Sequence, residues 1–257
     1  MEGTLGFVGT GTITEAIITG VFAEPNLAFE ILVSPRNTDV ATGLAKRYPA
    51  VRIASSNQEI VDAADMLFLA IRPQIAEEVI RSLRFRPDQL VVSLIAAVQE
   101  AKLVEWINQK VDLVRAVPLP FVADRTGVTM LYPPELRTAS FFSELGTAVE
   151  CETQNEYDLL TAASATMGTY FGILERATDW LASQGIPDQK ARDYLISLFA
   201  SLGKVSAKSV ERPPGDLRRE FSTRGGLNEQ LFIEFEQGGG SEALTAALES
   251  VLRRIKT

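Results

Sequence analysis

The stretch Gly6-Phe-Val-Gly-Thr-Gly-Thr-Ile-Thr-Glu-Ala16 decides which fold the chain adopts. The apolar residues around Phe7 predict a short strand, and the spacing of apolar residues from 16 to 21 predicts a helix. A strand, a tight glycine turn and a helix in this order open a dinucleotide-binding domain. We therefore expect an α/β fold whose first turn faces a nucleotide.

Glycine has a physical role at two positions of this turn. Gly9 permits the sharp change of direction, and Gly11 lets backbone N–H groups approach a pyrophosphate at the positive end of the helix. Thr14 occupies the third fingerprint position instead of a glycine. Gly-x-Gly also occurs in plain turns, but the strand before it and the helix after it favour a binding site. The expected cofactor contacts of this turn are Gly9, Thr10, Gly11, Thr12 and Ile13.

Composition excludes several classes of function. The 257 residues are 46% hydrophobic, enough for a substantial core in one or two domains. The net charge of −8, from 33 acidic and 25 basic residues, argues against a nucleic-acid partner. The apolar runs are too short to span a membrane, and the single cysteine, Cys151, cannot form an internal disulfide. We expect a cytoplasmic protein with a small-molecule substrate.

Histidine is absent from the chain. With a single cysteine, this excludes the usual zinc ligand sets, Ser-His-Asp triads and Cys-His pairs, and it removes the commonest general acid. A metal site made only of carboxylates stays open in principle, but the sequence has no tight acidic loop that would favour one. We therefore expect no metal.

The second predicted strand, Phe29–Val33, points to the choice of cofactor. An NAD-binding fold usually ends this strand with an acid that accepts from the ribose 2′-hydroxyl. Here the strand is followed by Ser34-Pro-Arg-Asn37, in which Ser34, Arg36 and Asn37 are donors and none is an acid. These residues suit a 2′-phosphate, so we expect NADP(H) to be preferred over NAD(H). Alternatively, Arg36 is a solvated loop residue.

Two continuous apolar runs predict central parallel strands, Met66–Ile71 and Leu90–Ile95. Ligands bind beyond the carboxyl ends of such strands, so the segments that follow should line the cofactor cleft. Arg72 has a simpler alternative as an exposed loop charge. The expected contacts here are Ala70, Arg72, Pro73 and Ala96.

The pattern changes near residue 152. Before it, strands and helices alternate, with further strands predicted at Val111–Val117, Val128–Leu131 and Ala148–Cys151 and a helix near Ser140–Leu145. After it, helices are predicted at 156–184, with an interruption at Gly168 left open, and at 188–210, 229–236 and 241–255, while Pro213-Pro-Gly215 predicts a turn. We expect a doubly wound sheet over 1–152 and a helical domain over 153–257.

A broad apolar stripe runs along one of these helices. It consists of Leu195, Ile196, Leu198, Phe199 and Leu202. Such helices either pack as a bundle on the first domain or interlock with a second copy of the chain, and periodicity does not separate the two.

The chain resembles the pyrroline-5-carboxylate reductases over nearly its full length. The segments that carry this resemblance are Gly6–Ile17, Ser34–Asn37, Ala70-Ile-Arg-Pro-Gln74, Ile95-Ala-Ala97, Arg115-Ala-Val-Pro118, Gly185-Ile-Pro187 and Gly225-Gly226. The resemblance implies a Rossmann-like domain, a helical domain that forms a homodimer, and hydride transfer from NADPH or NADH to a cyclic imine, as in proline biosynthesis.

The chain departs from the family where substrate should bind. The family's Arg-Ala-Met-Pro-Asn-Thr-Pro is Arg115-Ala-Val-Pro-Leu-Pro-Phe121 here, and its Pro-Gly-Gly-Thr-Thr is Arg224-Gly-Gly-Leu-Asn228. Its Ser-Gly-Ser-Gly-Pro-Ala-Tyr loop is represented by Ser164-Ala-Thr-Met-Gly-Thr-Tyr170, in an alignment that can shift by one residue. These changes indicate a divergent reductase with a different substrate.

Candidate residues for the chemistry follow from these segments. The hydroxyl candidates are Thr166, Thr169 and Tyr170, although a tyrosine such as Tyr170 is more often a half-buried packing residue. The candidates for binding a substrate carboxylate are Arg224, Gly225, Gly226, Leu227 and Asn228, with a plain helix-start turn as the alternative. Two other functions stay open: a carbonyl or 2-hydroxyacid oxidoreductase using Lys204 or Lys208, and a non-catalytic NADP-binding protein.

Overall fold

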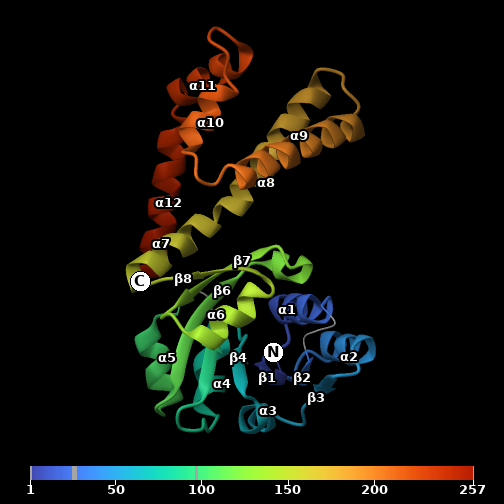
Figure 1. Ribbon diagram of the computed structural model, residues 1–257, viewed down its shortest axis with the longest axis vertical. Helices are drawn as coiled ribbons and strands as arrows, with labels where there is room; N and C mark the ends of the chain where they lie inside the picture. The colour runs from blue at the N-terminus through green and yellow to red at the C-terminus, as the bar shows by residue number, and fades with distance from the viewer. Residues whose placement is uncertain (1, 25–27, 96–97, 257) are drawn as a thin grey trace. The chain divides into compact units, whose positions relative to one another are not determined.

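The structure is a computed structural model and describes residues 2–24, 28–95 and 98–256 (Figure 1). The chain forms two compact units. The first comprises Met1–Thr161 together with Leu252–Thr257, and the second comprises Ala162–Val251. The first unit holds the sheet, and the second is helical.

The first unit is built on one eight-stranded sheet in the order β3-β2-β1-β4-β5-β6-β7-β8. Its strands are β1 (Glu2–Val8), β2 (Ala28–Val33), β3 (Val51–Ile53), β4 (Met66–Leu69), β5 (Leu90–Ser93), β6 (Asp112–Pro118), β7 (Gly127–Tyr132) and β8 (Gly146–Glu150). Neighbours from β3 to β6 are parallel, β6 and β7 are antiparallel, and β7 and β8 are parallel. This order confirms the predicted doubly wound sheet.

Helices cover both faces of the sheet. They are α1 (Thr12–Phe22), α2 (Thr38–Arg47), α3 (Asn57–Ala63), α4 (Pro73–Arg81), α5 (Glu100–Ile107), the short 3₁₀ helix η1 (Pro120–Asp124) and α6 (Leu136–Ser143). Residues of α1, α2 and α6 share one apolar core, and residues of α3, α4 and α5 share another. Strand β4 divides its side chains between them: Phe68 belongs to the first core, and Leu67 and Leu69 to the second. A strand buried on both faces is uniformly apolar for this reason.

The rest of the described chain is helical. Its elements are α7 (Gln154–Ser164), α8 (Thr166–Ser183), α9 (Asp188–Lys208), α10 (Pro214–Glu220), α11 (Leu227–Gln237) and α12 (Gly240–Lys256). The expected long helix is interrupted at Ala165, and Gly168 lies inside α8. The expected turn at Pro213-Pro-Gly215 instead opens α10, because Pro214 takes the first helical position, where a missing N–H costs nothing.

The second unit leaves much apolar surface uncovered. Within the predicted stripe, Leu195 is buried, whereas Ile196, Leu198 and Leu202 are exposed. Other large apolar side chains are exposed on the same unit: Phe171, Ile173, Trp180, Tyr194, Leu231, Ile233, Phe235 and Leu244. A face of this size indicates an interaction surface.

Candidate functional site

The turn after β1 contains a glycine that the fold requires. Gly9 has a φ of +106°, and a Cβ placed there would lie 2.2 Å from the carbonyl oxygen of Ala70. The Ala70 N–H in turn donates to the Val8 carbonyl oxygen at 2.9 Å. The close approach of the segments after β1 and β4 therefore excludes any side chain at position 9.

Threonine hydroxyls hold the same turn in shape. Thr14 is fully buried, and its Oγ1 donates to the Gly9 carbonyl oxygen at 2.9 Å. Thr10 is also buried and donates to the Ser34 carbonyl oxygen at 2.8 Å. The threonine at the third fingerprint position thus closes the turn with a hydrogen bond.

The N-terminus of α1 is open to a ligand. Gly11 is its N-cap residue and makes no side-chain cap, and a Cβ placed at Gly11 would meet nothing within 4 Å. The first N–H groups of an α-helix have no partner inside the helix, and here Thr12 is exposed above them. Free amides at the positive end of a helix suit a pyrophosphate, so this turn fits a dinucleotide.

The donors expected after β2 divide into occupied and free groups. Ser34 is buried, and its Oγ donates to Asn57 Oδ1 at 2.9 Å. Asn37 Nδ2 donates to the Thr10 carbonyl oxygen at 2.9 Å. Arg36 is exposed and, within the described chain, its guanidinium has no partner. Of the three expected donors, only Arg36 has its side chain free for a ligand.

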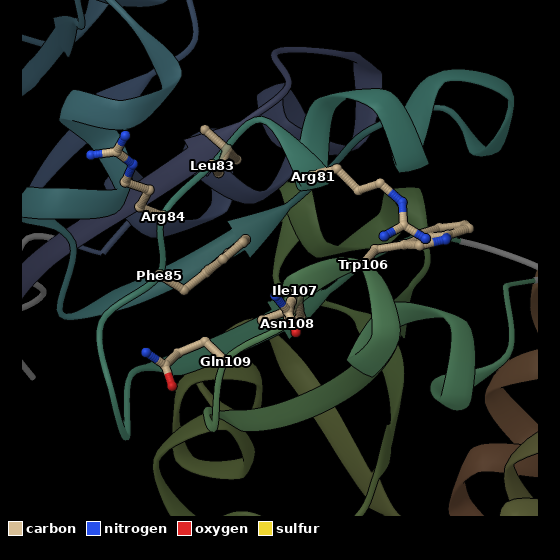
Figure 2. A pocket seen from close by; sticks show the side chains of 8 residues that line it. All are labelled: Arg81, Leu83, Arg84, Phe85, Trp106, Ile107, Asn108 and Gln109. Atoms are coloured by element: carbon tan, nitrogen blue, oxygen red, sulfur yellow. The ribbon is translucent and has the colours of Figure 1, made fainter.

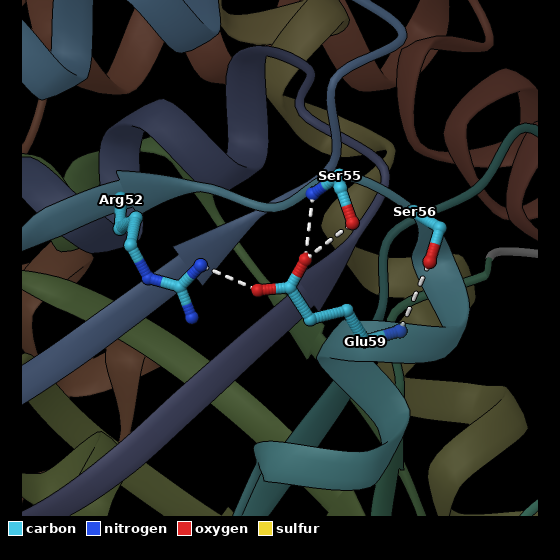
Figure 3. Close-up of polar contacts among 4 residues, drawn as sticks. All are labelled: Arg52, Ser55, Ser56 and Glu59. Atoms are coloured by element: carbon cyan, nitrogen blue, oxygen red, sulfur yellow. Dashed lines mark hydrogen bonds and ion pairs between the residues drawn. The ribbon is translucent and has the colours of Figure 1, made fainter.

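Helix α3 begins after β3, at the edge of the sheet where the carboxyl ends of β2 and β3 lie, and its first turn is capped (Figure 3). Ser56 is the N-cap of α3, and its Oγ accepts from the Glu59 N–H at 3.2 Å. The Glu59 carboxylate accepts from both the N–H and the Oγ of Ser55 at 2.7 Å, and it pairs with Arg52. The hydrogen bonds from Ser55 and Arg52 lower the pKa of Glu59 from 4.5 to about 2. The charge of Arg52 is therefore already balanced, unlike that of Arg36.

The cofactor candidates beyond β4 lie at the start of the next helix. Arg72 is the exposed N-cap residue of α4, and Pro73 is its first residue. Ala70 is half-buried and faces Gly9 through its carbonyl oxygen. Ala96, the fourth expected contact, lies outside the described residues. Because β1, β2 and β4 are parallel, their carboxyl ends bring the described candidates to one edge.

The hydroxyl candidates lie together in the first turns of α8. Thr166 is exposed, and its Oγ1 donates to the Ala163 carbonyl oxygen at 2.8 Å. Thr169 is exposed beside a shallow pocket of about 540 Å³ that Ile173 and Arg176 also line. The Tyr170 ring contacts the ring of Phe199 edge-on, so Tyr170 has a packing role.

The second glycine turn already binds a carboxylate of the chain. Gly225 has a φ of +72°, and its N–H donates to Glu229 Oε2 at 2.6 Å. Asn228 Nδ2 donates to the Phe221 carbonyl oxygen at 2.7 Å, and Leu227 is 84% exposed. Arg224 is exposed and has no side-chain partner in the described part of the chain. Gly226 is the N-cap of α11.

Three residues of these networks were not predicted. Asn57 orders Ser34, Glu59 neutralises Arg52, and Glu229 caps the second glycine turn. The signal for Glu229 is visible in the sequence, because an acid at the third helical position typically reaches back to an N–H before the helix. Asn57 has no comparable local signal.

A separate pocket of about 500 Å³ lies near the amino ends of β5 and β6 (Figure 2). Its lining residues are Arg81, Leu83, Arg84, Phe85, Trp106, Ile107, Asn108 and Gln109. Arg81 is paired with Glu77 at 2.9 Å and Glu105 at 2.5 Å. None of the predicted site residues lines this pocket.

The described residues lack two further kinds of feature. They contain no group of three or more acidic, cysteine or histidine side chains placed to hold a metal ion. None of their helices combines the length and the apolar character needed to cross a membrane.

Comparisons with known proteins place both parts of the chain among oxidoreductases. Residues 4–97 match the family described as NADP oxidoreductase, coenzyme F420-dependent, and residues 154–257 match the family described as pyrroline-5-carboxylate reductase dimerisation. The pyrroline-5-carboxylate reductase of Pseudomonas aeruginosa is 28% identical over 97% of this chain and 94% of its own.

Solved structures agree on the fold. A pyrroline-5-carboxylate reductase from Streptococcus pyogenes has a TM-score of 0.84 at 21% identity and covers 99% of this chain and 98% of its own. A Plasmodium falciparum pyrroline carboxylate reductase with NADP bound has a TM-score of 0.81 at 18% identity and covers 99% of this chain and 97% of its own.

Proposed function

Because this chain belongs to the pyrroline-5-carboxylate reductase family, we propose that it reduces the C=N bond of a small cyclic imino acid, pyrroline-5-carboxylate or a related imine. The observation that carries the proposal is the similarity to a curated reductase over 97% of the chain. The open glycine turn at the start of α1 supports the use of a dinucleotide. The protein is then an NAD(P)H-dependent oxidoreductase.

The proposal includes a preference for NADPH. Arg36 supports it, because it is a free cation after β2, at the position where an NAD-binding fold usually places an acid. A guanidinium matches the geometry and charge of a phosphate. The NADP bound to the Plasmodium falciparum relative is consistent with this choice.

The proposed reaction needs no strong general acid from the protein. When bound, the reduced nicotinamide supplies the hydride for the imine carbon. A cyclic imine that arrives as an iminium ion is already protonated, which suits a chain without histidine. We assign Thr166 or Thr169, with Tyr170 beside them, to orient the substrate nitrogen. The rate enhancement then comes from orienting the substrate and excluding water.

Arg224 is our candidate for the substrate carboxylate. It is exposed and unpaired in the described chain, whereas the neighbouring Gly225 N–H is occupied by Glu229. We further propose that the exposed apolar side chains of the helical unit pair two copies of the chain into a homodimer. The lone cysteine agrees with a cytoplasmic location.

The test follows NADPH absorbance with pyrroline-5-carboxylate as substrate, NADH as the paired cofactor and an independent measurement of cofactor binding. We expect imine reduction that is faster with NADPH. Turnover of oxo acids but not of imines would favour a carbonyl or 2-hydroxyacid oxidoreductase using Lys204 or Lys208. Cofactor binding without turnover on either panel would favour a non-catalytic NADP-binding protein.

A further inference from the structure

Strand β6 carries a buried cation outside the candidate site. Arg115 is only 4% exposed. The sheet register places it between the buried Ser93 on β5 and the half-buried Tyr132 on β7, so polar side chains occupy matching positions on three neighbouring strands. A cation is rarely buried unless it is paired, so this position needs a reason.

The partners of Arg115 come from the first two turns of α7. Its Nη1 donates to Gln154 Oε1 at 2.6 Å, and Gln154 Nε2 donates to Asp158 Oδ1 at 2.6 Å. The guanidinium carbon lies 4.5 Å from the centre of the Tyr157 ring. Arg115 Nε is buried and, among the described residues, has no hydrogen-bond partner.

Folding stability alone does not explain why an arginine is buried at this position. Among the described residues, the guanidinium contacts no carboxylate, because Gln154 stands between it and Asp158, and its Nε–H has no hydrogen-bond acceptor. Apolar side chains of similar volume usually serve a core at least as well as buried charges. What the arrangement does provide is a directional contact that fixes where the first turn of α7 lies on the sheet.

The C-terminal end of α12 also contacts the first turn of α7. Lys256 Nζ, at the end of α12, donates to Asn155 Oδ1 at 2.9 Å. Gln99 Nε2 donates to the Lys256 carbonyl oxygen at 3.1 Å. The chain leaves the first unit along α7 and returns to it along α12, and the first turn of α7 is contacted by Arg115 of β6 and by Lys256 of α12.

We infer that Arg115 is a positioning residue for the proposed imine reduction, acting through Gln154 to hold the first turn of α7 against β6. This inference rests on the proposed function. Helix α7 ends at Ser164, and the hydroxyl candidate Thr166 begins α8 two residues later. A shift of the first turn of α7 therefore moves residues that precede Thr166 in the chain. Displacements of about 1 Å at a reacting group can reduce rates on the order of 100-fold.

The experiment is a double-mutant cycle with Arg115→Met, Gln154→Leu and the double variant. In each protein we would measure kcat and KM for imine reduction, the Kd for NADPH and the midpoint of thermal unfolding. Each single variant should lose about 10- to 100-fold in kcat with an unchanged Kd for NADPH, and the double variant should lose no more than the worse single variant. Lys110→Ala, which removes an exposed ion pair with Asp88 and no contact of α7, is the control and should lose less than about 3-fold.

Arg115→Lys tests whether kcat depends on the planar guanidinium or only on the positive charge. A lysine keeps the charge but loses the geometry of the guanidinium, so we expect only partial recovery of kcat relative to Arg115→Met. If Arg115→Met does not fold, Gln154→Leu against Arg115→Lys still completes a cycle.

The outcomes are separable. A wild-type protein that binds NADPH but reduces no imine overturns the proposed function and the inference with it. A wild-type protein that reduces imines, with losses of kcat that add in the double variant or that follow the loss of thermal stability, overturns the inference alone.

Discussion

Two glycine turns that each begin a helix differ in what their amides bind. At the start of α1, no side chain caps the first N–H groups, and a Cβ added at Gly11 would have no atom within 4 Å. At the start of α11, the Gly225 N–H already donates to the carboxylate of Glu229. The first turn is left open for an external anion, whereas the second supplies an anion of its own.

The difference shows that a glycine pattern alone does not identify an anion site. Both turns have a glycine with a positive φ, Gly9 and Gly225, and both precede a helix. What separates them is an acid at the third position of α11, where α1 has Thr14. An anion that approaches Gly225 must displace Glu229, and an anion that approaches Gly11 displaces no side chain.

The largest expected effect comes from Gly9→Ala. The new Cβ would lie 2.2 Å from the Ala70 carbonyl oxygen at a φ of +106°, so we expect a loss of about 3 kcal/mol or more in the free energy of unfolding and of more than about 100-fold in NADPH affinity. Denaturant unfolding and a binding titration measure both. Gly225→Ala is the control, because its Cβ meets nothing within 4 Å, and it should cost only about 1 to 2 kcal/mol. Equal losses in the two variants would remove the distinction between the turns.

Arg36→Ala should lower the preference for NADPH over NADH. Removing a free guanidinium from a phosphate site costs about 1.5 to 3 kcal/mol, which is about 10- to 100-fold in the ratio of kcat/KM for the two cofactors. Arg52→Ala is the matched control, because the charge of Arg52 is already balanced by Glu59. An unchanged ratio in Arg36→Ala would mean that the 2′-phosphate lies elsewhere.

Glu229→Gln tests the second turn directly. Replacing the carboxylate weakens its bond to the Gly225 N–H and removes a negative charge, so KM for a carboxylated imine should fall by about 3- to 10-fold. Initial rates against imine concentration give this value. Glu234 lines a surface pocket together with Gly225 and Glu229 but does not contact the Gly225 amide, so Glu234→Gln should change KM by less than about 2-fold. A higher KM in Glu229→Gln would show that Glu229 helps substrate binding.

The smallest effect concerns the capped start of α3. Because folding lowers the pKa of Glu59 to about 2, its contribution to stability is present above its unfolded pKa of 4.5 and is lost as the pH falls from 4.5 towards 2. The difference in unfolding midpoint between wild type and Glu59→Gln should therefore shrink over this range. A difference that persists at pH 2 would contradict the assignment. Glu78→Gln, an exposed change on α4, controls for the loss of one charge.

Periodicity predicted most of the fold and part of the site. The glycine turn, the apolar strands and the change to helices near residue 152 follow from local patterns, and the sheet order confirms the doubly wound class. Helix α10 was missed because a proline pair was interpreted as a turn. The interruption at Ala165 could not be predicted, because no glycine or proline marks it. The boundary at residue 152 stays a prediction.

Local sequence patterns could not show that the side chains of Ser34 and Asn37 already donate hydrogen bonds within the protein. Ser34 and Asn37 look available in the sequence, but their partners, Asn57 and Thr10, lie 23 and 27 residues away. A hydroxyl or amide cannot be assigned to a ligand until its internal bonds are known. Of the three donors expected after β2, Arg36 alone has no side-chain partner among the residues that the structure describes.

The return of α12 to the first unit has a consequence for the order of folding. The contacts of Lys256 join residues separated by 157 and 101 positions, whereas the strands of the sheet pair largely with near neighbours in the chain. During synthesis the sheet can therefore assemble before residue 252 leaves the ribosome, while the second attachment of the helical unit must wait. A nascent chain passes through a stage in which that unit is tethered at one end only, with its apolar faces still uncovered.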